Sequence, residues 1–374
     1  MPLVANVYRL GVKELWSLVR DPVMLVLIVW TFTVSIYVSA TAMPETLHKA
    51  PIAIVDEDRS PLSMRIAAAF SPPRFNQPAM IAVPDIDPGM DAGKYTFVLN
   101  IPPDFERDVL AGITPAIQLN VDATRMSQAF TGSSYIQQMV QGEVNEFIRH
   151  HRDVVIPPID LALRTRFNQN LEQSWFGSLM EVINNVTMLS IILTGAALIR
   201  EREHGTIEHL LVMPVTPVEI MLAKVWSMGL VVLLAATGSM VFVVQGVLHV
   251  PIDGSVLLFL AGATLHLFAT CALGIFMATV ARSMPQFGLL AMMILLPLQL
   301  LSGNTTPRES MPDILQFVML AAPTTHFVAA SQAILFRGAG LSVVWPQFLA
   351  LVAIGAVLFI VALGRFRRTI SQMS

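Results

Sequence analysis

The chain has 374 residues, of which 54% are apolar and only 13% are charged. This composition is far from the soluble average, so much of the chain must face lipid. The formal net charge of -3 argues against a nucleic-acid partner, which needs a dense basic surface. The single cysteine, Cys271, excludes an intramolecular disulfide.

Residues 1–22 precede the first long apolar run and predict an amphipathic helix. At about 100° per residue, one arc of this helix holds apolar and aromatic side chains, namely Val4, Tyr8, Val12, Leu15, Trp16 and Val19. The other side holds Arg9, Lys13, Ser17 and Arg20. The pattern is typical of a helix in the headgroup plane of a membrane. A cytosolic helix packed on a partner is the alternative.

Long apolar runs predict six transmembrane helices, because a helix of about 20 apolar residues satisfies its own backbone groups across the hydrocarbon layer. The predicted spans are 23–42, 182–199, 225–248, 256–281, 286–303 and 343–363. The residues Ala40-Thr41-Ala42 resemble a signal-peptide cleavage site, but the preceding apolar run is too long for a signal peptide. An uncleaved anchor is therefore expected.

A further apolar stretch, 314–336, is interrupted by polar and helix-breaking residues at 323–326. We predict a re-entrant or interfacial segment here rather than a seventh span. The distribution of Lys and Arg supports six spans, because short cytoplasmic loops retain positive charge. One side of the topology carries ten basic residues: Arg9, Lys13, Arg20, Arg200, Arg202, Lys224, Arg282, Arg365, Arg367 and Arg368. Both termini are therefore predicted to be cytoplasmic.

Residues 43–178 differ from the rest, with Pro, Asp and Gly between short alternating runs. Strands are predicted at 52–56, 80–83, 95–101 and 116–122, and helices at 60–70, 103–111 and 128–151. The result is an α/β domain with a long helix, placed outside the cytoplasm between the first and second spans. Its polar residues form no recognised metal or nucleophile spacing, so a structural or partner-docking role is favoured over binding or catalysis.

Motifs for nucleotide binding and hydrolysis are absent from the sequence. It lacks the P-loop, the dinucleotide fingerprint G-x-G-x-x-G and the serine-hydrolase elbow G-x-S-x-G. His204, Glu208 and His209 resemble the H-x-x-E-H zinc arrangement, but one residue too many separates the histidines, which lie about 140° apart on a helix. We therefore expect no metal site and no catalytic residues.

Strongly polar residues within the predicted spans are few, and each is costly in lipid and should face the bundle interior. They are candidates for a substrate pathway: Asn184, Asn185, Gln245, His266 and Gln299. Hydrogen bonding between packed helices is the alternative, and the favoured one. The spans carry no chain of Asp, Glu or His of the kind that a proton-coupled carrier uses.

A charged stretch between the second and third spans has the pattern of a short helix, parallel to the membrane, that presents one face to a soluble partner. Its candidate residues are Arg200, Glu201, Arg202, Glu203, Gly205, Thr206, Glu208, Leu210, Leu211, Pro214, Glu219 and Lys224.

From Glu201 to Lys224 the sequence resembles the ABC-2 type permeases, which share E-R-E-x-G-T-x-E-x-L-L-x-x-P-x-x-x-x-E-x-x-x-x-K here. Leu301-Ser302-Gly303 and Phe336-Arg337-Gly338 add to the resemblance, and Ile101-Pro102-Pro103-Asp104-Phe105 is similar to the subgroup with a large domain between helices one and two. His204 and His209 are not part of the family pattern.

The resemblance implies an α-helical fold of the ABC-2, or type V exporter, class in a bacterial inner membrane. It implies a connecting helix in 1–22, a transmembrane domain over 179–371 and a coupling helix at 200–214. The re-entrant segment would be 314–336. The implied partners are cytosolic ABC ATPase domains, a second permease half and a periplasmic adaptor, and ATP and Mg would be bound by the ATPase rather than by this chain.

Three functions remain in competition at this point. Efflux of a hydrophobic or amphipathic substrate, driven by a partner ATPase, is the first. The second is a membrane receptor or scaffold whose extracytoplasmic domain binds a ligand or partner. The third, an intramembrane enzyme, would rely on His266 and Cys271, which are about 140° apart on one helix.

Overall fold

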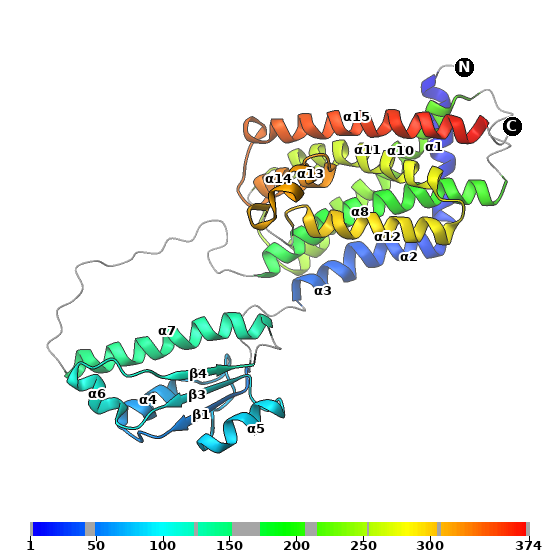
Figure 1. Cartoon of the computed structure of the whole chain (residues 1–374). Coiled ribbons are helices and arrows are strands. Elements are labelled where there is room, and N and C mark those ends of the chain that lie inside the picture. The colour runs from blue at the N-terminus through cyan, green and yellow to red at the C-terminus, as the bar shows by residue number, and fades with distance from the viewer. Residues whose placement is uncertain are drawn as a thin grey trace. The chain divides into compact units, whose positions relative to one another are not determined.

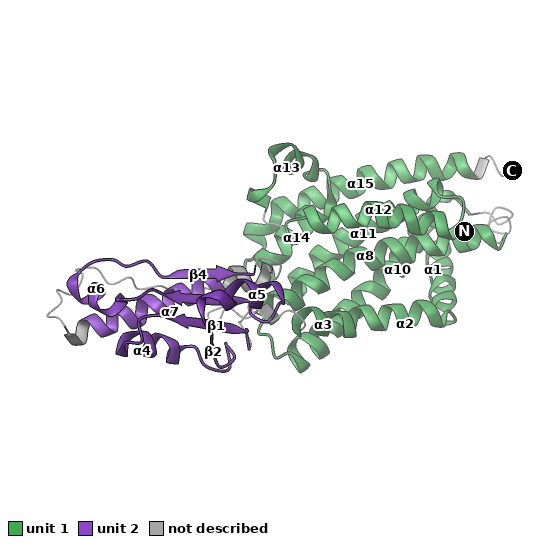
Figure 2. Ribbon diagram, turned by 60° about the horizontal axis from the view of Figure 1, so that its bottom comes forward, with its two compact units in different colours: residues 1–42, 166–374 green, residues 43–165 purple. Residues whose placement is uncertain are grey.

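The structure is a computed structural model that describes residues 3–41, 49–122, 126–151, 173–205, 215–252, 254–304 and 308–371. The chain divides into two compact units, one of residues 1–42 with 166–374 and one of residues 43–165 (Figure 2). The first unit is helical, and the second is built on a β-sheet (Figure 1).

Within the described residues of the helical unit, six helices are long and apolar enough to cross a membrane. The first, Pro22–Thr41, comprises α2 (Pro22–Trp30), the π-helix η1 (Thr31–Ser35) and α3 (Ile36–Thr41). The others lie in α8 (Gln173–Glu203), α10 (Pro217–Ser239) with the π-helix η3 (Met240–Val247), α11 (Val256–Val280), α12 (Met284–Leu301) and α15 (Leu341–Ser371). The six predicted spans are confirmed, although α8 and α15 extend well beyond the predicted limits.

Local sequence explains where two of these helices begin. The Asp21 side chain accepts hydrogen bonds from the backbone N–H groups of Val23 and Met24, and Pro22 occupies the first turn of α2. Thr216 and Glu219 form a reciprocal capping box at the start of α10, and Pro217 occupies the first turn directly after Thr216. Both helices therefore start at residues that satisfy otherwise unpaired backbone donors.

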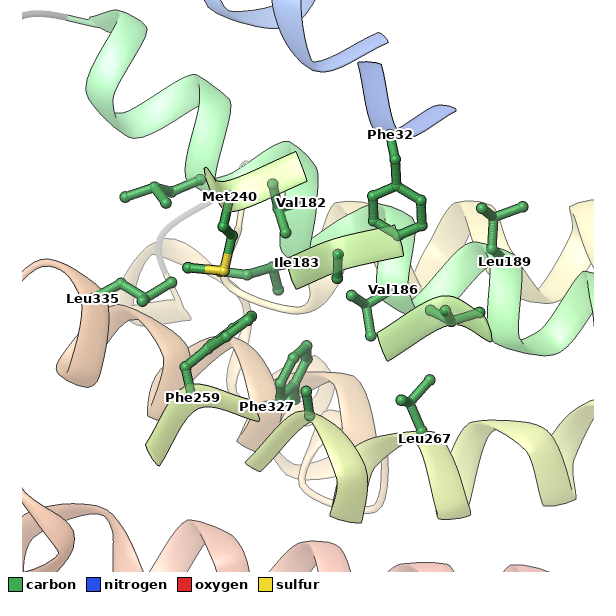
Figure 3. Close-up of a cluster of buried hydrophobic side chains, with 14 of the residues drawn as sticks. Phe32, Val182, Ile183, Val186, Leu189, Met240, Phe259, Leu267, Phe327 and Leu335 are labelled. Carbon is green, nitrogen blue, oxygen red and sulfur yellow. The ribbon is translucent and has the colours of Figure 1, made fainter. Parts of the chain in front are cut away.

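The centre of the bundle is an apolar cluster from α8, α10, α11, α14 (Pro323–Leu335) and the first span (Figure 3). Val186 of α8 lies between Phe32 and Leu267 in this cluster, and Leu189 lies beside them (Figure 3). The rings of Phe259 and Phe327 are 5.8 Å apart. Aromatic and branched side chains thus fill this part of the interior.

The backbones of α8 and α11 approach closely where Gly274 faces Ile191. A Cβ on Gly274 would lie 2.6 Å from the Ile191 carbonyl oxygen, closer than real Cβ atoms approach any heavy atom. Small residues at helix contacts are a usual way for membrane helices to pack tightly. The contact between the second and fourth spans therefore depends on the missing side chain of Gly274.

The stretch predicted to be re-entrant forms two helices, α13 (Asp313–Met319) and α14, bent by 90°. The break falls at 320–322, three residues before the predicted interruption at 323–326. Those residues form the first turn of α14, where a proline is tolerated. The short 3-10 helix η4 (Arg308–Ser310) precedes the pair.

The second unit contains a four-stranded sheet in the order β2-β1-β3-β4. The central strands β1 (Ile52–Asp56) and β3 (Phe97–Ile101) run parallel, with Ile52 opposite Phe97, whereas β4 (Gln118–Val121) is antiparallel to β3. The edge strand β2 (Ala79–Met80) pairs parallel with β1. These strands confirm the predicted positions, except that the second is shorter and gives way to the 3-10 helix η2 (Val83–Asp85).

Helices cover the sheet. The predicted helices are present as α4 (Pro61–Ala69), α6 (Phe105–Ala111) and α7 (Met126–His151). A further helix, α5 (Ile86–Asp91), was not predicted. Phe75, Phe97 and Tyr135 form the centre of the core between the sheet and α7. The unit therefore has its own buried core of aromatic and aliphatic side chains.

The two points where the helical unit connects to the α/β insertion are neighbours. α3 and the start of α8 pack so closely that a Cβ on Gly177 would lie 3.1 Å from the Ser39 carbonyl oxygen. The Ser35 hydroxyl also donates a hydrogen bond of 2.7 Å to Glu181. The chain thus leaves and re-enters the helical unit at adjacent helix ends.

Candidate functional site

The charged residues Arg200–Glu203 form the last turn of α8, and Gly205 follows with a φ of +68°. The prediction of a separate coupling helix that starts at Arg200 is therefore wrong at this end, because the second span continues straight through the charged residues. Long charged side chains at a helix end reach aqueous headgroups while their stems pack on apolar neighbours. Thr206, Glu208, Leu210, Leu211 and Pro214 lie outside the described residues.

Arg200, Arg202 and Glu203 each contact the end of another membrane helix. Arg200 forms an ion pair of 2.6 Å with Asp21, the residue that caps α2. The Arg202 guanidinium donates to the carbonyl oxygens of Ala278 and Ala281 at the end of α11. Glu203 accepts a hydrogen bond of 2.8 Å from the backbone N–H of Met284, the first residue of α12.

The signs of these charges match the helix ends that they contact. A helix C-terminus carries unpaired carbonyl groups and partial negative charge, which suits Arg202, and a helix N-terminus carries unpaired N–H groups, which suit Glu203. The charged end of α8 therefore supplies hydrogen bonds that α11 and α12 cannot make internally.

The fourth residue, Glu201, belongs to a charge cluster from three helices, in which Glu14, Glu201 and Lys224 are buried and Lys13 is exposed. Lys224 of α10 lies 2.7 Å from Glu201 and 3.1 Å from Glu14, and Lys13 lies 2.6 Å from Glu201 and 3.5 Å from Glu14. Lys224 is only 1% exposed. Burial raises the pKa of Glu14 above its usual value, against the opposing pull of Lys224.

Glu14 and Lys13 come from α1 (Leu3–Val19), which packs along α10. Trp226 of α10 donates a hydrogen bond of 3.1 Å to the Val7 carbonyl, and its ring stacks on Tyr8. The Asn6 side chain donates a hydrogen bond of 3.0 Å to Glu219. Glu219 therefore has two roles, because it also caps α10 through Thr216. The charged end of α8 and the start of α10 thus hold α1 in place.

The buried face of α1 lies outside the apolar arc, although Tyr8 of that arc stacks on Trp226 of α10. Its buried residues are Asn6, Gly11, Glu14 and Leu18, whereas Val4 and Trp16 are 75% and 60% exposed. The apolar arc remains available to a bilayer surface, which the amphipathic pattern predicted, and the opposite stripe packs on the protein. Sequence periodicity alone missed this second contact, because three of its four members, Asn6, Gly11 and Glu14, are polar or small.

The candidate pathway residues do not converge. Asn185 donates a hydrogen bond of 2.8 Å to the Thr31 carbonyl, where the first span changes to a π-helix, whereas His266 contacts Thr187 at 2.8 Å and stacks on Phe327. Asn184 and Gln299 are half-buried, and Gln245 is exposed. The two fully buried members therefore serve contacts between helices, the alternative that the sequence favoured.

Hydroxyl groups that the sequence analysis did not single out complete a polar seam between α8 and α11. The Ser190 hydroxyl donates a hydrogen bond of 2.7 Å to the Thr270 hydroxyl, which in turn donates one to the His266 carbonyl. The Thr187 hydroxyl donates to the Ile183 carbonyl of its own helix. Such residues lie inside apolar runs, so their only sequence signal is the spacing of small hydroxyl residues by three or four positions, as in Thr187, Ser190 and Thr194.

The described part of the chain contains no cluster of side chains suited to catalysis or metal binding. His266 and Cys271 contact different partners on α8, Thr187 and the Ser190 carbonyl. No group of three metal-binding side chains is present among the described residues. His204 is exposed, and His209 lies outside the described part.

These features define a class: a multi-pass helical membrane protein with a folded α/β insertion and a charged helix end that links its spans. The sequence model of the ABC-2 family transporter proteins matches residues 15–363. The chain therefore belongs to the ABC-2 family of transport permeases.

Named relatives support the same conclusion over nearly the whole chain. The inner membrane transport permease YhhJ of Escherichia coli K12 is 61% identical over 369 residues, which cover 99% of each chain. The probable multidrug ABC transporter permeases YbhR and YbhS of the same organism are each 27% identical. YbhR aligns over 96% of this chain and 97% of its own length, and YbhS over 95% and 94%.

Proposed function

We propose that this chain is the membrane-spanning subunit of an ATP-driven exporter in a bacterial inner membrane. Partner ABC ATPase domains bind ATP and Mg and hydrolyse the nucleotide on the cytoplasmic side, and a second permease half completes the pathway. The chain itself supplies no catalytic residue. Its cargo is a hydrophobic or amphipathic compound, in line with the multidrug names of two relatives.

The observation that carries this proposal is the connection of the α8 end to five other helices. Arg200 reaches α2, Arg202 reaches α11, Glu203 reaches α12, and Glu201 meets charges from α1 and α10. A partner that pushes on the loop after Gly205 would move the α8 end, and these short contacts would pass the displacement to all five helices. That is the arrangement a two-state coupling mechanism needs.

The topology supports the same function. Both termini and the charged end of α8 lie at one end of the helical unit (Figure 1). The positive-charge distribution supports a cytoplasmic location for that end, where an ATPase is available. The α/β unit is inserted between the first and second spans, so in this proposal it lies in the periplasm and offers a surface to an adaptor.

The decisive experiment is purification of the tagged full-length chain from its native membrane in mild detergent, with mass identification of bound proteins and an ATP hydrolysis assay. We expect a P-loop ATPase to co-purify. Glu203→Gln should lower substrate-stimulated or basal hydrolysis several-fold without reducing membrane insertion, because it removes the negative charge that faces the N-terminus of α12. Glu57→Gln, in the α/β unit, is the control. Recovery of an ATPase-free complex would refute the proposal.

A second candidate, a receptor or scaffold, is favoured by one feature of the α/β unit. A groove of about 750 Å³ lies between α6, α7 and the strands β3 and β4, with Phe105, Leu119 and Val140 among its lining residues. This volume is in the range of small-molecule sites, about 300–1,000 Å³. No charged side chain lines the groove. It therefore suits an uncharged, largely apolar ligand.

The groove can be tested in the intact chain, because its single cysteine, Cys271, is buried and leaves labelling specific to an introduced thiol. Gln137→Cys places an environment-sensitive fluorophore in the groove, and Ser71→Cys places one elsewhere on the same unit. Titration with the uncharged probe N-phenyl-1-naphthylamine should change the signal at position 137 alone. A receptor would show this response in a complex without an ATPase.

A further inference from the structure

A basic cavity lies where the ends of α8, α11 and α15 meet. Its volume is about 920 Å³, and its charged lining residues are Arg202, Glu203, Arg282, Arg365 and Arg368. Four arginines and one glutamate give a net charge of +3, although the whole chain carries -3. The cavity is therefore a local concentration of positive charge in a slightly acidic protein.

The charges in this cavity differ in what they already contact. Arg202 is occupied by the terminal carbonyls of α11, and Glu203 by the first N–H of α12. Arg282 and Arg365 form no ion pair with another described residue, and the Arg365 guanidinium lies 6.0 Å from the centre of the Phe276 ring. Because Arg202 neutralises the negative end of α11, that helix end does not offset the charge of Arg282 and Arg365.

The wall of the cavity beside these arginines is apolar and exposed. Ile360 and Val361 belong to α15, which crosses the membrane, and their side chains are 67% and 49% exposed. They lie about one turn before Arg365, on the apolar side of the charged end of the helix. Positive charge at the headgroup level directly beside exposed aliphatic side chains matches the two ends of one molecule, an anionic headgroup and an acyl chain.

We infer that this cavity binds an anionic phospholipid, with the phosphate held by Arg282 and Arg365 and an acyl chain along Ile360 and Val361. The guanidinium groups offer charge-assisted, bidentate hydrogen bonds to a phosphodiester. A bound lipid would tie the last span to the loop between α11 and α12. Free phosphate shares the headgroup chemistry but would gain nothing from the aliphatic wall.

The test uses the purified full-length chain in detergent, titrated with phosphatidylglycerol, phosphatidylcholine or inorganic phosphate, with bound lipid counted by native mass spectrometry and the thermal midpoint followed in parallel. Phosphatidylglycerol should bind and raise the midpoint, whereas phosphatidylcholine and phosphate should not. The double variant Arg282→Gln/Arg365→Gln should bind phosphatidylglycerol about 30-fold more weakly, since each basic side chain near an anionic lipid contributes about fivefold.

The matched control is Arg59→Gln/Arg337→Gln, which removes the same charge from exposed positions outside the cavity. It should retain wild-type lipid binding. Equal binding of phosphatidylcholine and phosphatidylglycerol by the wild-type chain would overturn the inference, whether or not the variants fold. An equal effect of inorganic phosphate would overturn it as well, because that result would identify a soluble-anion site.

Discussion

Lys224→Met should be among the most damaging single substitutions in the helical unit. The lysine is 1% exposed, and its ammonium lies 2.7 Å from Glu201 and 3.1 Å from Glu14. Methionine preserves most of the volume but removes the charge, so Glu14 and Glu201 lose the buried cation of the cluster and retain the half-exposed Lys13 as a cationic neighbour. Removal of one member of a buried charge cluster costs about 3–5 kcal/mol of the free energy of unfolding.

Lys13→Met is the matched control, because Lys13 contacts the same Glu201 at 2.6 Å but its side chain is 48% exposed. Water screens that pair, so its loss should cost about 1 kcal/mol or less. The contrast between the two lysines therefore tests burial rather than distance.

The free energies of unfolding can be compared by denaturant titration of the purified variants in mixed micelles, with tryptophan fluorescence as the signal. The double variant Lys224→Met/Glu14→Gln, which restores charge balance, should recover about 1–3 kcal/mol relative to Lys224→Met. The reasoning would be refuted if Lys224→Met lowered the free energy of unfolding no more than Lys13→Met does. It would also be refuted if the double variant recovered none of the stability lost in Lys224→Met.

Three further predictions concern other contacts of the helical unit. Gly274→Ala should destabilise it by about 1–3 kcal/mol, because the new Cβ would lie 2.6 Å from the Ile191 carbonyl, whereas Gly288→Ala, with nothing within 4 Å, should be neutral in the same thermal melt. Asn185→Leu should cost about 1–2 kcal/mol through the lost hydrogen bond to Thr31, against almost nothing for Thr264→Val, whose exposed hydroxyl bonds only within its own helix. Burial raises the pKa of Glu14, so its contribution to stability is present when it is protonated and falls as pH rises through the raised pKa. Thermal midpoints between about pH 5 and about pH 8 should show this fall in the wild type and a smaller one in Glu14→Gln, and equal profiles would contradict the assignment.

The spans and the sheet were predictable because each depends on a pattern carried by neighbouring residues. Apolar runs of membrane length gave all six membrane helices, and alternation gave β1 and β3 within two residues. The helix α5 was missed because Pro88 and Gly89 within it are typical of a turn. The π-helix η1 also had no sequence signal, since the Asn185 side chain that contacts it comes from another span.

The candidate site was predictable only in part. The charged stretch Arg200–Glu203 is visible in the sequence. Its contacts with five helices are not, because they depend on partners up to 188 residues away, such as Lys13. Periodicity placed Lys13 on the solvated side of α1 and gave no reason to pair it with a particular glutamate. For the same reason, Lys224 reads in the sequence as an ordinary basic residue at the cytoplasmic start of a span.

The adjacent helix ends at Ser39 and Gly177 bear on the history of the fold. An insertion whose two attachment points touch can be gained, lost or exchanged without a change in the path of the surrounding chain. A short turn could join α3 to α8 in its place and leave the path of the membrane helices unchanged. The α/β unit can therefore change in size without a rearrangement of the helices at its attachment points.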